Sequence, residues 1–201
     1  MRRSFSLLSV FVAAGACVVL FFTGCVKPPD QQLVAAKAAF NAARDAEADK
    51  YMANNFSNLK RAMEAAEEEV AAQQGKSGLS QNYSKAKVLL TGVTELGNKI
   101  AAEAPQAKKE MKKEIEQGLA ASQEKAKEIR KDIKRAPKSK GKKALAEMAS
   151  DLDKADQALL AAQAALATGK IIDAGEKLGN AQGLLKKIND KLSTDGLDGL
   201  M

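Results

Sequence analysis

The sequence predicts an all-α protein, and three observations support that prediction. From residue 26 onward this 201-residue chain contains 35 alanines, and alanine has the highest helix propensity but buries little area. The same part keeps only four aromatic residues, and its apolar residues recur at spacings of three and four. We therefore expect an elongated all-α structure, in which two related antiparallel helical hairpins are joined by a long charged helix.

The N-terminus has the pattern of an export signal. Arg2 and Arg3 precede an apolar run from Phe5 to Phe22, the layout of a secretory signal peptide. The residues Phe22-Thr23-Gly24-Cys25 resemble the lipobox of bacterial lipoproteins, which implies removal of residues 1–24 and acylation of Cys25. With Val26 next, the resemblance implies the periplasmic face of the outer membrane. The alternative is an uncleaved anchor, since the run is near the lower limit for a membrane span. Both interpretations place residues 26–201 outside the cytoplasm.

Helices follow a lipidated tether, residues 25–29. Asp30 is a suitable N-cap, and the helical pattern after it continues to Asn54-Asn55, where we expect a break or kink. A second helical pattern ends in a loop at residues 75–78, and helix resumes at about Asn82. We assign residues 30–104 to the first hairpin, because the residue before Pro105 disfavours helical backbone angles. Alternatively, Pro105 begins the next helix.

Residues 105–136 are predicted to form the charged connecting helix. Their apolar positions, spaced 4, 4, 3, 4, 3 and 4, make a narrow heptad-like stripe: Met111, Ile115, Leu119, Ser122, Ala126, Ile129 and Ile133. A linker at 137–142 leads to the second hairpin, residues 143–192, which turns at Thr168-Gly169. We expect residues 193–201 to form a flexible tail.

The two hairpins repeat each other in sequence. Their second helices match in identical spacing, Ala86, Leu90, Val93, Leu96, Lys99 and Ile100 aligning with Ala174, Leu178, Ala181, Leu184, Lys187 and Ile188. The alternative is chance similarity between alanine-rich helices. Two repeats are too few for a stable solenoid, so we expect the hairpins to pack on each other or on the connecting helix.

Two further resemblances concern these hairpins. The stretch from Tyr51 to Ala62, with residues 82–86, resembles a family of small alanine-rich helical envelope lipoproteins that often show Tyr-Ala-Pro-x-x-Leu-x-x-Ala followed by Gly-x-Tyr-x-x-Ala. Asn54 stands at the usual proline. The family has no established activity but is linked to outer-membrane-protein-A-type envelope proteins. The residues from Gly169 to Ala174 resemble a tetratricopeptide turn, which implies hairpin geometry only.

The residue inventory argues against an enzyme. The chain has no histidine, Cys17 lies in the signal and Cys25 is expected to carry lipid, which excludes Ser-His-Asp and Cys-His catalysis and zinc sites with Cys or His ligands. The Gly75-Lys76-Ser77 run has Val70 where a phosphate-binding loop needs glycine. We therefore expect no cofactor, metal or small-molecule substrate. A glycan hydrolase that uses two carboxylates is a distant alternative.

The basic residues are concentrated in one segment. Residues 108–143 carry a net charge of +8, whereas residues 26–107 are neutral and residues 144–201 carry −3. One interpretation is a solubilising helix surface, and the functional one is contact with an anionic envelope surface. The candidate contact residues are Lys108, Lys109, Lys112, Lys113, Arg130, Lys131, Lys134, Arg135, Lys138, Lys140, Lys142 and Lys143. Nucleic acid is not expected, because the segment lacks interleaved aromatic residues.

These features together predict a membrane-anchored envelope lipoprotein with a structural, scaffolding or protein-interaction role. Its expected partners are the membrane, through the lipid anchor, and an envelope protein, anionic lipid or cell-wall component. The alternative is a helical accessory or sensor subunit of a larger envelope complex.

Overall fold

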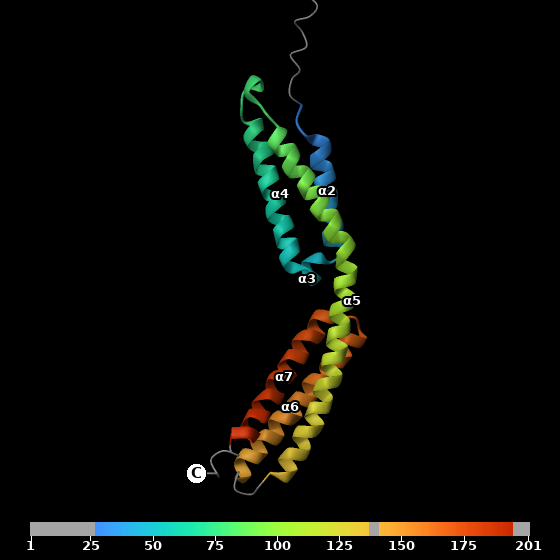
Figure 1. Ribbon diagram of the computed structural model, residues 1–201, viewed down its shortest axis with the longest axis vertical. Coiled ribbons are helices and arrows are strands. Elements are labelled where there is room, and N and C mark those ends of the chain that lie inside the picture. The colour runs from blue at the N-terminus through green and yellow to red at the C-terminus, as the bar shows by residue number, and fades with distance from the viewer. Residues whose placement is uncertain (1–26, 137–140, 195–201) are drawn as a thin grey trace, which may run out of the picture. The chain divides into compact units, whose positions relative to one another are not determined.

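The computed structural model describes residues 27–136 and 141–194. In these residues it contains six α-helices, one short 3-10 turn and no strand, so the all-α prediction is confirmed (Figure 1). The chain divides into two compact units. Unit 1 contains the described residues up to Asp45 together with Asn54–Ala101, and unit 2 contains Ala46–Ala53 together with the described residues from Ala102. The predicted signal at 1–24, Cys25, residues 137–140 of the predicted linker and residues 195–201 of the predicted tail lie outside the described residues. Lys142, expected in the linker, begins the helix Lys142–Ala167, and Ser193 and Thr194, expected in the tail, end the helix Ile171–Thr194.

Unit 1 is built from α2 (Asp30–Asp45), α4 (Ala53–Gln74) and the first part of α5 (Ser84–Arg135). Each helix turns one apolar face inward. Two contacts join α2 and α4: the rings of Phe40 and Phe56 have centroids 5.2 Å apart, and Lys37 lies 3.2 Å from Glu67. The earlier α2 residue meets the later α4 residue, so these two helices are antiparallel. The inward residues of the three helices are Ala36, Ala39, Ala43, Leu59, Met63, Ala66, Val70, Ala86, Leu90 and Val93.

The approach of α2 to α5 depends on a glycine. A Cβ placed on Gly97 would lie 2.9 Å from the backbone carbon and oxygen of Ala39 and from its Cβ. Both backbones are helical and cannot yield without moving a whole helix. Gly97 therefore allows a helix separation that any larger residue would prevent.

The chain breaks earlier than the sequence predicted. Helix α2 ends at Asp45, the short α3 spans Ala48–Tyr51, and Glu47 between them has a left-handed φ of 60°. A second interruption falls at Met52, two residues before the predicted break at Asn54-Asn55, and both asparagines lie in the first turn of α4. Asparagine is favoured at helix starts, so the pair did mark a helix boundary. The two residues begin a helix rather than interrupt one.

The predicted helix boundary at Pro105 is also wrong. Helix α5 is continuous over 52 residues and includes Pro105, so residues 105–136 are its C-terminal part rather than a separate connecting helix. A proline inside a helix removes one backbone hydrogen bond and crowds the carbonyl one turn earlier. Pro105 is exposed, which leaves the freed carbonyl on a face that water reaches.

Unit 2 packs the C-terminal part of α5 against α6 (Lys142–Ala167) and α7 (Ile171–Thr194). The expected second hairpin and its turn are confirmed. Gly169 has a left-handed φ of 75°, and the Lys170 N–H donates to the carbonyl of Ala165 at 2.9 Å, closing the end of α6. The heptad-like stripe faces the core: Ile115, Leu119, Ser122, Ala126 and Ile129 are buried, with Met111 and Ile133 partly buried.

The repeat is preserved in burial as well as in sequence. In α5 and α7 the four aligned pairs 86/174, 90/178, 93/181 and 100/188 are buried in both units. Leu96 and Leu184 are both half-buried, and Lys99 and Lys187 are both exposed. The second helix of each hairpin therefore presents the same face to its own unit, which supports duplication over chance similarity.

We predict that Gly97→Ala destabilises unit 1, although alanine improves helix propensity by up to ~1 kcal/mol. The added methyl would clash with the α2 backbone at Ala39. Gly92→Ala in the same helix is the matched control, since a Cβ there meets nothing within 4 Å. Thermal unfolding followed by circular dichroism should show a lower midpoint for Gly97→Ala and an unchanged or higher one for Gly92→Ala. Equal stabilisation by both substitutions would contradict the close packing.

Candidate functional site

The first group of predicted contact residues lies on α5, and one of its members is already paired. Lys108 Nζ lies 2.5 Å from Glu47 Oε2 and 5.2 Å from the ring centroid of Tyr51, all within unit 2. The hydrogen bond from Lys108, with a second one from Lys50, lowers the pKa of Glu47 to about 2. Bonding to Glu47 in turn raises the pKa of Lys108. The charge of Lys108 is thus compensated inside the unit.

The rest of the first group faces solvent. Lys109, Lys112 and Lys113 are exposed on α5, and Lys112 lies 3.8 Å from Glu116 one turn later. Such exposed pairs contribute little energy and leave the cation accessible. These residues form a solvated helix face rather than a site with converging groups.

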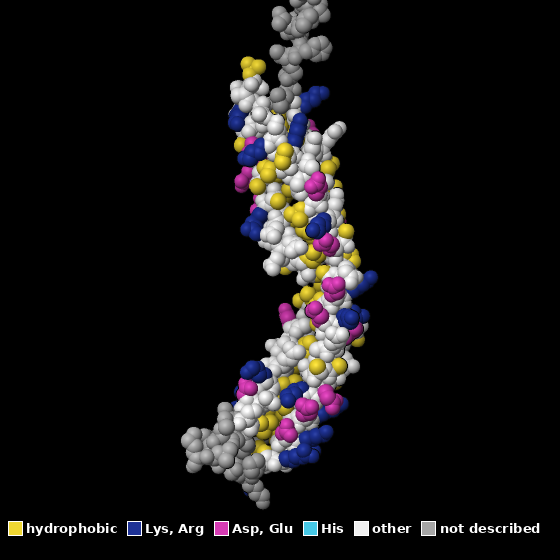
Figure 2. All heavy atoms as spheres, viewed as in Figure 1, with side chains coloured by type: hydrophobic (Ala, Val, Ile, Leu, Met, Phe, Trp, Pro, Cys, Tyr) yellow, Lys and Arg dark blue, Asp and Glu magenta, His cyan; other side chains and the backbone are white. Residues whose placement is uncertain are grey.

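The remaining predicted contact residues run from Arg130 to Lys143, and those of them that the structure describes gather at one end of unit 2. Helix α5 ends and α6 begins there, and Figure 2 shows Lys and Arg side chains collected at this end. Arg130 is held by an ion pair with Asp156 of α6. Five further cations are exposed and make no ion pair with any described residue: Lys131, Lys134, Arg135, Lys142 and Lys143. We call these five residues the basic end. Lys138 and Lys140 lie outside the described residues.

Part of this clustering has a structural cause. Cations near a helix C-terminus are stabilised by the negative end of the helix dipole, which applies to Lys131, Lys134 and Arg135. Lys142 and Lys143 occupy the first turn of α6, where the dipole has the opposite sign and cations are disfavoured. Helix stability therefore does not explain the positive charge on both sides of the α5–α6 connection.

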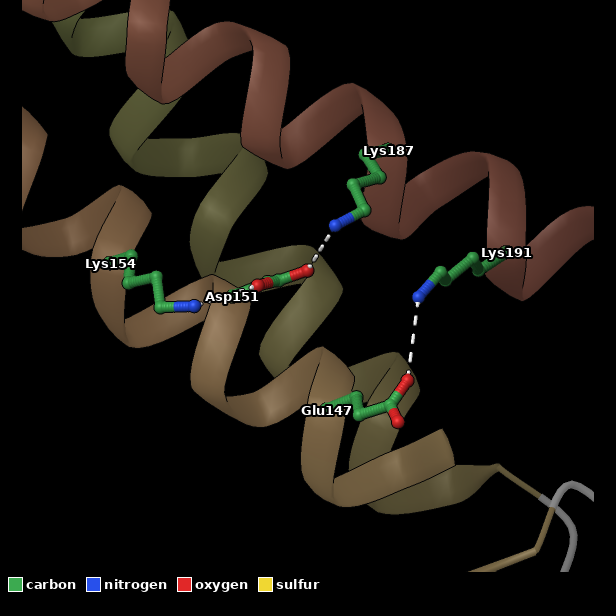
Figure 3. A network of polar contacts seen from close by, with 5 residues as sticks. All are labelled: Glu147, Asp151, Lys154, Lys187 and Lys191. Carbon is green, nitrogen blue, oxygen red and sulfur yellow. Dashed lines mark hydrogen bonds and ion pairs between the residues drawn. The ribbon is translucent and has the colours of Figure 1, made fainter. Parts of the chain in front are cut away.

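A polar clamp holds α6 against α7 in the half of the hairpin that includes the basic end. The carboxylate of Asp151, largely buried, accepts hydrogen bonds from Lys187 at 2.9 Å and from Lys154 at 3.3 Å, and Glu147 lies 3.8 Å from Lys191 (Figure 3). The bonds from Lys187, then Lys154, lower the pKa of Asp151, and Asp151 raises the pKa of Lys187.

Sequence analysis missed this clamp. Asp151 lies between Met148 and Leu152 on the buried face of α6, where a charged residue needs a partner. An aspartate on an apolar helix face was therefore the one sign in the sequence that a buried ionic contact would form there. Its partner, 36 residues later on another helix, was not evident from local pattern.

Several hollows occur in the described surface of both units, and two of them are the most relevant to a site. A cleft of about 440 Å³ in unit 2 is lined by charges of both signs with Tyr51 and Ile172, and a groove of about 320 Å³ in unit 1 lies between α2 and α4. The carboxylates whose pKa is shifted, Glu47, Glu69 and Asp151, are all shifted downward and so are held ionised. A general acid needs the opposite shift.

Within residues 27–136 and 141–194 no cluster of three or more metal-ligating side chains occurs, and none of the helices there is long and apolar enough to cross a bilayer. Comparison of the chain with protein-family models, with curated proteins and with solved structures found no match.

We predict that Asp151→Asn lowers the thermal unfolding midpoint at neutral pH, because the amide loses the charge that Lys187 and Lys154 bind. The pKa of Asp151 is lowered in the folded state, so its contribution is present above the ordinary aspartate pKa and is lost as pH falls through the folded value. The difference between wild type and variant should therefore vanish in acid.

Asp153→Asn is the matched control, since Asp153 is an exposed neighbour on the same helix. It removes the same charge and should change the midpoint little at any pH. A deficit of Asp151→Asn that persists unchanged in acid would show that the clamp is not electrostatic.

Proposed function

We propose that this protein is a lipid-anchored envelope protein with a structural, scaffolding or protein-interaction role, held at the outer membrane through Cys25. The observation that supports the interaction role is the basic end, which presents five exposed cations where two helices meet, none of them in an ion pair with a described residue. Such a surface attracts anionic polymers or lipid headgroups over a distance limited by a Debye length of ~8 Å at physiological salt.

A binding role fits the chemistry of the described surface better than catalysis. A glycan hydrolase needs one carboxyl group with a raised pKa near a second, ionised carboxylate. Among the described residues, every carboxylate with a shifted pKa is shifted downward by lysine partners. These groups instead act as fixed anions that orient helices.

The anchor is tested by Cys25→Ser. Each buried acyl CH₂ contributes ~0.8 kcal/mol to membrane attachment, so the acylated protein should remain with the outer membrane. The serine variant should be lost from the outer-membrane fraction in a gradient separation of envelopes, with mass spectrometry of the wild type identifying the acylated residue. Wild-type amounts of Cys25→Ser in the outer membrane would refute the anchor.

The basic end is tested by a fourfold variant, Lys134→Gln, Arg135→Gln, Lys142→Gln and Lys143→Gln. We expect reduced cosedimentation with anionic envelope material at low salt, since the cations that attract it are removed, and no change in helical content. Cell-wall sacculi and anionic lipid vesicles, used separately, distinguish the two sources of negative charge.

The control removes four exposed cations from unit 1 instead: Lys37→Gln, Arg44→Gln, Lys60→Gln and Arg61→Gln. It lowers net charge equally, so a nonspecific charge effect would weaken both variants alike. Equal weakening of both variants, or wild-type binding by the basic-end variant, would show that the basic end is only a solvated surface and not a binding site.

A further inference from the structure

Exposed apolar residues are unevenly distributed over the described surface. Five large apolar side chains are substantially exposed there, and three of them belong to unit 1: Leu79 at 99%, Val88 at 72% and Val34 at 68%. Single exposed aliphatic residues are ordinary on protein surfaces. These three are notable because they belong to one end of the unit.

The helix directions bring the three residues to that end. Helix α4 runs into the loop that carries Leu79, and α5 runs out of it, so Val88 is one turn from the loop. Because α2 is antiparallel to α4, its start lies at the same end, and Val34 is one turn from that start. Figure 1 shows the start of α2 and the α4–α5 loop at this end of unit 1. We call residues 27–34 and 75–88 the loop end.

The loop presents Leu79 on an ordered turn. Leu79 is the middle residue of the 3-10 turn Gly78–Ser80, which is closed by the Ser80 N–H donating to the Ser77 carbonyl at 2.8 Å. The Asn82 N–H donates to the buried side chain of Gln73 at 3.1 Å, which ties the loop to α4. Figure 2 shows an apolar side chain at the loop tip. An almost fully exposed leucine is thus held outward by hydrogen bonds rather than folded back onto the unit.

The loop end also lies next to the proposed lipid anchor in sequence. Pro29 is buried in the described structure and precedes α2 directly, while Cys25 is only four residues earlier. Four extended residues span about 14 Å at most. An acylated Cys25 would therefore keep Pro29, the residue directly before α2, within that distance of the bilayer surface.

The charges of the loop end suit a membrane surface. Four lysines are exposed there: Lys85, which pairs with Glu69 of α4 at 2.6 Å, and three others, Lys27, Lys76 and Lys87. Asp30 is the only acidic residue of the loop end. Lysines close to an anionic leaflet contribute ~1 kcal/mol each, and apolar side chains of surface-bound segments enter the bilayer boundary by roughly 5–10 Å. Val34 and Val88 each lie four residues from the start of their helices, which is a rise of ~6 Å along the helix axis and falls within that depth.

We propose that the loop end of unit 1 rests on the phospholipid surface that holds the anchor, with Leu79 inserted among the acyl chains and the three lysines at the headgroup phosphates. This inference rests on the proposed acylation of Cys25. It adds a second contact that orients unit 1 on the bilayer, because an acyl anchor alone leaves the attached protein free to rotate about its tether.

The test uses the absence of tryptophan from the chain. The processed Leu79→Trp protein, purified with its acyl anchor, is reconstituted into vesicles of phosphatidylethanolamine and phosphatidylglycerol, with and without brominated acyl chains. If Leu79 inserts, the emission maximum of Leu79→Trp should lie at shorter wavelength than that of a tryptophan exposed to water. Its intensity should fall when the lipid is brominated. Leu160→Trp, at an exposed leucine on α6 of unit 2, is the matched control and should show neither change.

Flotation of the vesicles separates the two proposals. If the protein floats with the lipid but Leu79→Trp is quenched no more than Leu160→Trp, the loop end does not insert and the anchor still stands. If the acyl-bearing protein does not float with the lipid, both the anchor and the insertion are wrong. Strong quenching of Leu79→Trp alone, with unchanged helical content, supports the loop end as a membrane contact.

Discussion

Close approach of helices through small residues is the constraint on which both units depend. Alanine buries little apolar area, so a helix rich in alanine gains stability only if its neighbour comes near enough for backbone and Cβ atoms to touch. Unit 1 meets this condition where Gly97 lies against the backbone and Cβ of Ala39. In unit 2, Gly118 instead leaves room for the side chain of Leu178 against the α5 backbone. Larger side chains then fill the space that remains, which explains why four aromatic residues suffice after residue 26.

Ionic contacts add direction to this packing. Helices that touch through small residues can slide, because methyl groups define a register poorly. Asp151 with Lys187 sets α6 against α7, and Glu47 with Lys108 sets the α3 segment against α5. In each case an anion whose pKa is lowered is held between two lysines. These charges therefore serve register and orientation.

The two surfaces proposed as contacts differ in chemistry. The loop end of unit 1 combines an outward leucine with lysines, a mixture suited to the boundary between headgroups and acyl chains. The basic end of unit 2 is defined by Lys and Arg side chains alone. Such a surface suits a hydrated anionic partner. An anchored protein with these two surfaces would bind lipid through one unit and an envelope component through the other, which is a linking role.

The sequence by itself determined what depends on local periodicity. Helix class, the α6–α7 hairpin with its glycine turn, the buried stripe of α5 and the duplicated faces of α5 and α7 all follow from spacing and propensity within one segment. Only the tertiary structure decided that α5 continues through Pro105, that the chain breaks at Glu47 and that Lys108 is paired. These outcomes depend on partners up to 61 residues apart, such as Glu47 and Lys108. Periodicity describes which face a residue occupies, but it does not specify which residue of another helix will meet it there.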